Sequence, residues 1–85
     1  MTRDEIFQKV LQIVKPYVKN QAALNEANDS TRFIEDLKVN SARLVDIVLE
    51  FEDSFQFTIN DEEAEEILTI GKAVDLITQK LAEIR

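Results

Sequence analysis

The sequence has no cysteine and no histidine, and only one glycine and one proline among its 85 residues. Without cysteine there can be no disulfide or thiolate metal site, and without histidine the usual general base near neutral pH is missing. Scarce glycine and proline argue against a fold of many β-hairpins. No apolar run reaches about 18 residues, and the opening Met-Thr-Arg-Asp-Glu lacks an apolar signal core. We therefore expect a cytoplasmic chain with no membrane insertion.

Acidic residues outnumber basic ones by 17 to 10, which gives a net charge of −7. Phosphate binding needs clustered lysine and arginine, so the composition argues against a nucleic-acid partner and against an anionic membrane surface. A basic protein surface is the natural complement, because long-range attraction speeds the encounter. Repulsion between strongly acidic copies also favours a monomer.

Apolar residues recur at helical spacing along most of the chain, which is short enough for a single domain over residues 1–85. The pattern predicts an all-α fold, a small four-helix bundle of three main helices and one short helix with a long first loop. The short helix is indicated by Asn60 and Glu63, which have the spacing of a capping box. The helices are expected over residues 3–18, 41–55, 60–67 and 70–83.

Two features qualify this pattern. Pro16 removes a backbone donor inside the first predicted helix, so that helix is expected to end or kink near Lys15. Residues 19–40 form a polar connection of a length that is uncommon in a small domain and is often functional. Apolar residues interrupt its second half and are expected to pin it to the core. These residues are Phe33, Ile34 and Leu37.

Ser41 lies where the long connection gives way to the second predicted helix. A serine at this position can simply cap the helix, or its exposed hydroxyl can be modified. Asp46, Glu50 and Asp53 follow at helical spacing and form an acidic stripe beside the buried face. Such a stripe is either an ordinary solvated face or a docking surface for basic proteins.

The remaining candidates point to structure more than to chemistry. Phe51, Phe55 and Phe57 are expected in the core, whereas Val45 and Leu49 flank it and are expected to be partly exposed. The carboxylates of residues 61–66 lie side by side on one short helix and cannot surround a cation, so no metal site is predicted. No pair of a base and a nucleophile indicates an enzyme.

Four segments of the sequence resemble the acyl carrier protein family. Residues 31–37 (Thr-Arg-Phe-Ile-Glu-Asp-Leu) are similar to its approach to a modified serine, and residues 45–55 to its acidic recognition helix. Residues 59–67 and 69–77 are similar to its third helix and to the opening of its fourth. Together the four segments cover nearly the whole chain in the expected order.

The resemblance implies that a phosphopantetheinyl transferase attaches 4′-phosphopantetheine from coenzyme A to Ser41. Acyl groups would then be carried as thioesters on the thiol of this group, which explains a carrier without cysteine. The other implied partners are acyl-transfer or synthase enzymes with basic patches, in fatty-acid, polyketide or related lipid biosynthesis. The implied partner-binding residues are Asp36, Asn40, Asp46, Glu50 and Asp53, with Glu52 in support. The implied acyl-chain pocket, between the second and third helices, contains Ile59, Ala64 and Ile67.

The residues around Ser41 depart from the family pattern of Asp-Ser-Leu with a glycine two residues before the aspartate. Asn40 replaces the aspartate, Ala42 replaces the leucine, and Lys38 stands where the glycine is usual. Arg43 adds a positive charge where acidic residues are common. We interpret the chain as a specialised carrier. The alternative is a module that keeps the carrier fold, stays unmodified and docks to a basic partner through the same stripe.

Overall fold

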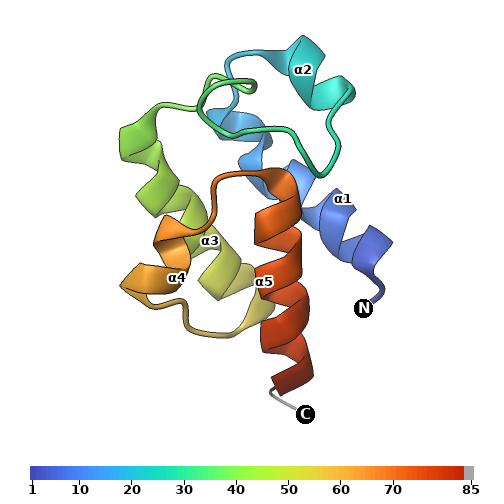
Figure 1. Cartoon of the computed structure of the whole chain (residues 1–85), viewed down its shortest axis with the longest axis vertical. Helices are drawn as coiled ribbons and strands as arrows, with labels where there is room; N and C mark the ends of the chain where they lie inside the picture. Colours follow the sequence, from blue (N-terminus) through green and yellow to red (C-terminus); the bar gives the residue numbers. More distant parts are fainter. Residues whose placement is uncertain (84–85) are drawn as a thin grey trace.

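The computed structural model describes residues 1–83, and its regular elements in that range are all helical (Figure 1). An isolated antiparallel bridge between Arg32 and Thr69 is the only strand-like pairing there. The predicted all-α class is confirmed. The α-helices are α1 (Arg3–Val14), α2 (Gln21–Asn25), α3 (Leu44–Phe55), α4 (Asp61–Glu65) and α5 (Ile70–Glu83), with 3-10 turns η1 (Lys15–Tyr17) and η2 (Ser41–Arg43).

Helix α1 begins at a capping box and ends just before the proline. The Thr2 hydroxyl accepts a hydrogen bond from the Glu5 backbone N–H, and the Glu5 carboxylate accepts one from the Thr2 N–H. Because Pro16 has no N–H to donate, the α-helix gives way to η1 after Val14. The predicted end near Lys15 is confirmed.

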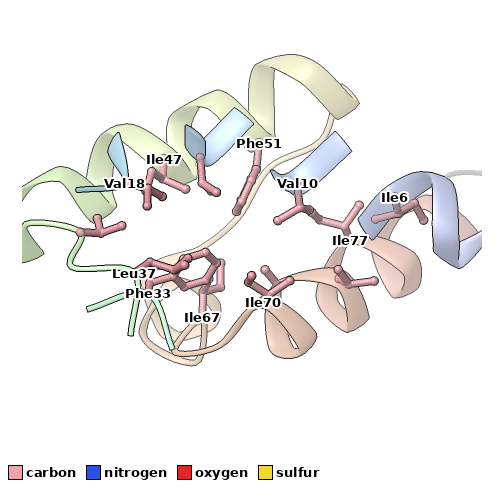
Figure 2. Close-up of a cluster of buried hydrophobic side chains, with 14 of the residues drawn as sticks. Ile6, Val10, Val18, Phe33, Leu37, Ile47, Phe51, Ile67, Ile70 and Ile77 are labelled. Carbon is pink, nitrogen blue, oxygen red and sulfur yellow. The ribbon is translucent and has the colours of Figure 1, made fainter. Parts of the chain in front are cut away.

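The core lies where α1, α3 and α5 meet (Figure 2). Val10, Phe51 and Ile77 contribute from the three helices, and none of them has measurable solvent exposure. Phe55 is also buried, and Phe57 stacks on it, with ring centroids 6.0 Å apart and Phe57 half-buried. The prediction of a core position is thus confirmed for Phe51 and Phe55 and partly for Phe57.

The connection over residues 19–40 contains a helix that the sequence pattern did not predict. Asn20 caps α2, because its Oδ1 accepts a hydrogen bond from the Ala23 N–H at 3.1 Å, and Leu24 is buried. A helix of only five residues is too short for a repeating apolar face, so periodicity could not reveal it.

The second half of this connection is fixed to the segment that joins α4 to α5. Phe33 and Leu37 are fully buried and lie beside Ile67 and Ile70 in Figure 2. The Phe33 N–H donates to the Leu68 carbonyl at 3.2 Å, and the Ile70 N–H donates back at 2.9 Å to the carbonyl of Thr31. The predicted pinning holds for Phe33 and Leu37. It is wrong for Ile34, which stays exposed, with an exposed fraction of 41 %.

Two helix boundaries differ from the predicted ones. The α-helix of the second main element begins at Leu44, and Ser41 lies in the 3-10 turn before it. Helix α4 ends at Glu65 because the next N–H groups bond three residues back, from Glu66 to Glu63 and from Ile67 to Ala64. The Asn60–Glu63 capping box and the start of α5 at Ile70 match the predictions.

Gly71 allows the connection to approach α5 closely. Its N–H donates to the Asp29 carbonyl at 2.9 Å, and a Cβ at this position would lie 2.7 Å from that oxygen and 2.8 Å from the Asp29 Cβ. Both contacts are shorter than real Cβ atoms tolerate. A side chain at residue 71 would therefore push the connection away from α5.

We predict that Gly71→Ala lowers the free energy of unfolding by about 1–3 kcal/mol, as overpacking does. A glycine-to-alanine change inside an unconstrained helix has the opposite sign, about 0.5–1 kcal/mol of stabilisation. Urea unfolding followed by circular dichroism decides between them. The exposed neighbour supplies the control, since Lys72→Ala should stay within about 0.5 kcal/mol of the parent. A more stable Gly71→Ala protein contradicts the close approach.

Candidate functional site

Ser41 is exposed and is the first residue of η2, directly before α3. The structure assigns the cap to Asn40, whose Oδ1 accepts a hydrogen bond from the Ala42 N–H at 2.9 Å. The Arg43 N–H donates to the Asn40 carbonyl at 2.8 Å. Within residues 1–83 the hydroxyl of Ser41 has no hydrogen-bond partner, so it is available for chemistry and is not the capping group.

The chain enters this turn through a residue in the left-handed region. Lys38 has a φ of 59°, a conformation in which glycine is favoured because a Cβ crowds the backbone. The next residue, Val39, is buried, and its N–H donates to the Phe33 carbonyl at 2.9 Å. This left-handed conformation explains why a glycine is usual at this position in the family pattern described above. Lys38 adopts the conformation although it has a side chain.

The acidic stripe lies along α3. Glu50 and Asp53 are exposed, and neither forms an ion pair within the described part of the chain. Asp46 differs, because its Oδ2 lies 3.0 Å from the Arg43 Nη1. The stripe is therefore partly neutralised at the end nearest Ser41 and fully charged further along the helix.

Two other predicted contact residues have local structural roles. The Asp36 Oδ2 accepts a hydrogen bond from the Arg32 N–H at 2.8 Å and so closes the turn over residues 32–36. The Glu52 Oε2 accepts one from the Ile59 N–H at 2.7 Å and fixes the connection after α3. Contact of either residue with a partner stays a prediction.

Two grooves open beside the start of α3, and Leu44 borders both. The first, which we call the α3–α4 groove, has a volume of about 420 Å³, and its walls include Val48, Ile59 and Ala64. The second, the loop groove, has a volume of about 320 Å³ and includes Ile67. The structure therefore brings Ile59 and Ala64 together, while Ile67 lies in the neighbouring groove.

Large apolar side chains are exposed around both grooves. Val45 and Leu49, with exposed fractions of 64 % and 56 %, border the α3–α4 groove, which confirms their predicted exposure. Ile34 and Leu68, at 41 % and 63 %, border the loop groove. Sequence reasoning missed Leu68 and Leu44 as site residues. The available signal for Leu68 was a second large apolar residue next to Ile67 in the short link after α4.

One ion pair fixes α4, a wall of the first groove, to α5. The Lys80 Nζ lies 2.8 Å from the Glu63 Oε1, and both side chains are about three-quarters buried, with 20 % and 25 % exposure. The Lys80 ammonium, and after it the Asn60 N–H, lower the pKa of Glu63 from its ordinary 4.5. Folding therefore favours the charged form of Glu63.

We predict a pH-dependent cost for Glu63→Gln, which keeps the cap but removes the charge. Because the folded pKa is lowered, the stabilisation is complete above pH ~4.5 and is lost as pH falls through the folded pKa. The variant should unfold at lower urea than the parent near neutral pH, and the difference should shrink as the pH falls below 4.5 and through the folded pKa. Glu62→Gln on the same helix is the control. A constant difference across the pH range contradicts the assignment.

The residues around Ser41 fit a group attached through a phosphodiester. The hydroxyl is exposed, a cation follows two residues later at Arg43, and apolar grooves lie on both sides of Leu44. No cluster of three or more potential metal ligands occurs among residues 1–83. In the same range no helix is long and apolar enough to cross a membrane.

No family model matches the chain, but individual proteins do. The acyl carrier protein of Petrotoga mobilis is 40 % identical over 81 residues, which is 95 % of this chain and 93 % of that protein. The acyl carrier protein of Rubrobacter xylanophilus is 37 % identical over 79 residues, covering 93 % and 95 %. The solved structure of the acyl carrier protein from Enterococcus faecalis, at 38 % identity, covers 94 % of this chain and 99 % of that one with a TM-score of 0.77.

Proposed function

The chain belongs to the acyl carrier protein family, and on that basis we propose that it carries acyl groups on 4′-phosphopantetheine attached to Ser41. Its relatives are carriers and not catalysts, and members of the family generally bear this group. The observation that carries the proposal is the exposed hydroxyl of Ser41. This hydroxyl does not cap the turn, because the side chain of Asn40 does so.

The atom of this chain that reacts in the attachment is the hydroxyl oxygen of Ser41. The Ser41 Oγ forms a bond to the phosphorus of coenzyme A that carries pantetheine, the phosphoanhydride bond breaks, and the nucleotide leaves. The proton of the hydroxyl goes to a base of the transferase. Once attached, the group supplies a thiol on a flexible arm, and this thiol holds the acyl group as a thioester.

The size and lining of the α3–α4 groove support the proposal that the acyl chain binds there. Its volume of about 420 Å³ falls in the range of small-molecule pockets. Ile59 and Ala64, the predicted pocket residues, lie on its wall together with Val48. The third predicted pocket residue, Ile67, would act from the loop groove on the other side of Leu44.

The negative charge of α3 supports the proposal that the partners are enzymes with basic patches. These would be a phosphopantetheinyl transferase and acyl-transfer or synthase enzymes, with fatty-acid biosynthesis as the usual setting of the family. Exposed carboxylates steer a basic surface and give fast, weak docking, which suits a carrier that visits several enzymes. With a net charge of −7, the copies repel one another, and we propose a monomer.

We predict that incubation with coenzyme A and a broad-specificity phosphopantetheinyl transferase adds one phosphopantetheine to the intact mass. Ser41→Ala should abolish the gain, because it removes the attacking oxygen. Ser30→Ala, a change at another exposed serine, should be modified like the parent. Folded protein that gains no mass with several transferases favours the alternative, an unmodified module that docks to a basic partner.

We predict that reversing the two unpaired carboxylates of the stripe, in Glu50→Lys/Asp53→Lys, slows this modification. At low salt kcat/KM should fall about tenfold, and the difference should shrink in high salt because screening removes the attraction. The matched control, Glu26→Lys/Glu83→Lys, changes the net charge equally at exposed sites away from α3. Equal rates for both double variants would remove the docking role of the stripe.

A further inference from the structure

A single cation interrupts the acidic surface that follows Ser41. Between Lys38 and Lys72 the sequence holds nine aspartates and glutamates, and its only basic residue is Arg43. Resting on the proposed function, we propose that Arg43 selects partner enzymes whose basic docking face includes a carboxylate opposite this guanidinium. The partner would thus recognise one positive charge together with the carboxylates of α3, and not a uniformly acidic helix.

Arg43 lies where every enzyme that reaches Ser41 must meet it. Both residues belong to the short turn η2, and the exposed fraction of the Arg43 side chain is 64 %. The fold does not need the guanidinium. The contribution of Arg43 to the turn is a backbone hydrogen bond, from its N–H to the Asn40 carbonyl at 2.8 Å, which any residue except proline can donate. The charge is therefore available for recognition.

The present partner of Arg43 can be exchanged easily. Its Nη1 lies 3.0 Å from the Asp46 Oδ2, but both side chains are well exposed, at 64 % and 41 %. Ion pairs this exposed contribute little to stability. A partner that offers lysine or arginine to Asp46 and a carboxylate to Arg43 satisfies both charges. A partner that offers only basic groups satisfies Asp46 and places like charges against Arg43.

The apolar side chains around Arg43 increase the energetic cost of placing a like charge against it. Val45 and Leu49 on α3, and Ile34 and Leu68 across Leu44, are the exposed large apolar side chains that flank the turn. An enzyme that covers them expels water from the contact, and charges there interact more strongly than in bulk solvent. An unfavourable pair then discriminates between partners, as repulsive elements do in specific interfaces.

The test measures kcat/KM for modification of Ser41 by a transferase whose carrier-binding face is basic, with Arg43→Glu compared with the parent. The variant should react roughly three- to tenfold faster at low ionic strength, and the gain should shrink in high salt. Lys15→Glu is the matched control, because it makes the same charge change at an exposed site on η1. It should change the rate less than about twofold.

A second arm reverses the transferase. When the basic residues of its carrier-binding face are changed to glutamate one at a time, at least one change should speed the parent carrier and slow Arg43→Glu. Circular dichroism confirms that each carrier is folded. Modification of all carriers at equal rates, with no such crossover, overturns the selection by Arg43 and leaves the proposed function intact. No modification of any carrier overturns both.

Discussion

The site depends on one constraint, the attachment of the long connection to the link between α4 and α5. Burial of Phe33 and Leu37 supplies the apolar part of this contact, and the backbone bonds between Phe33 and Leu68 and between Thr31 and Ile70 set its register. Gly71 lets the two segments approach closely. Because these contacts hold residues 29–39 against the α4–α5 link, they also position the turn that begins at Ser41 on the surface.

The charges around the Ser41 turn are unevenly distributed along α3. Exposed carboxylates continue along α3 away from Ser41, and Arg43 neutralises the nearest of them. Apolar side chains border both grooves beside this turn, so an enzyme that docks here can combine steering by charge with burial of apolar surface. In the proposed function, a small carrier without histidine or cysteine thereby presents its hydroxyl to the chemistry of other proteins.

Much of the fold could be predicted because its signals are local. The periodicity of α1, α3 and α5 and the capping box at Asn60 are read directly from residue spacing, and Pro16 marks the end of α1. The exceptions depend on tertiary contacts or on short elements. Helix α2 is too short to show a period, and the spacing of apolar residues did not separate the exposed Ile34 from the buried Phe33 and Leu37.

The candidate site could be predicted less completely. Spacing placed Ser41 and the acidic residues near one another, but it could not show that Asn40 provides the cap, that Asp46 pairs with Arg43, or that Leu44 divides the apolar surface into two grooves.

The contact between the long connection and the α4–α5 link also bears on the order of events during synthesis. Contacts between residues distant in sequence form slowly, and the partners at residues 68–71 leave the ribosome well after the serine does. The mature arrangement around the hydroxyl therefore cannot form on a nascent chain until those later residues are available.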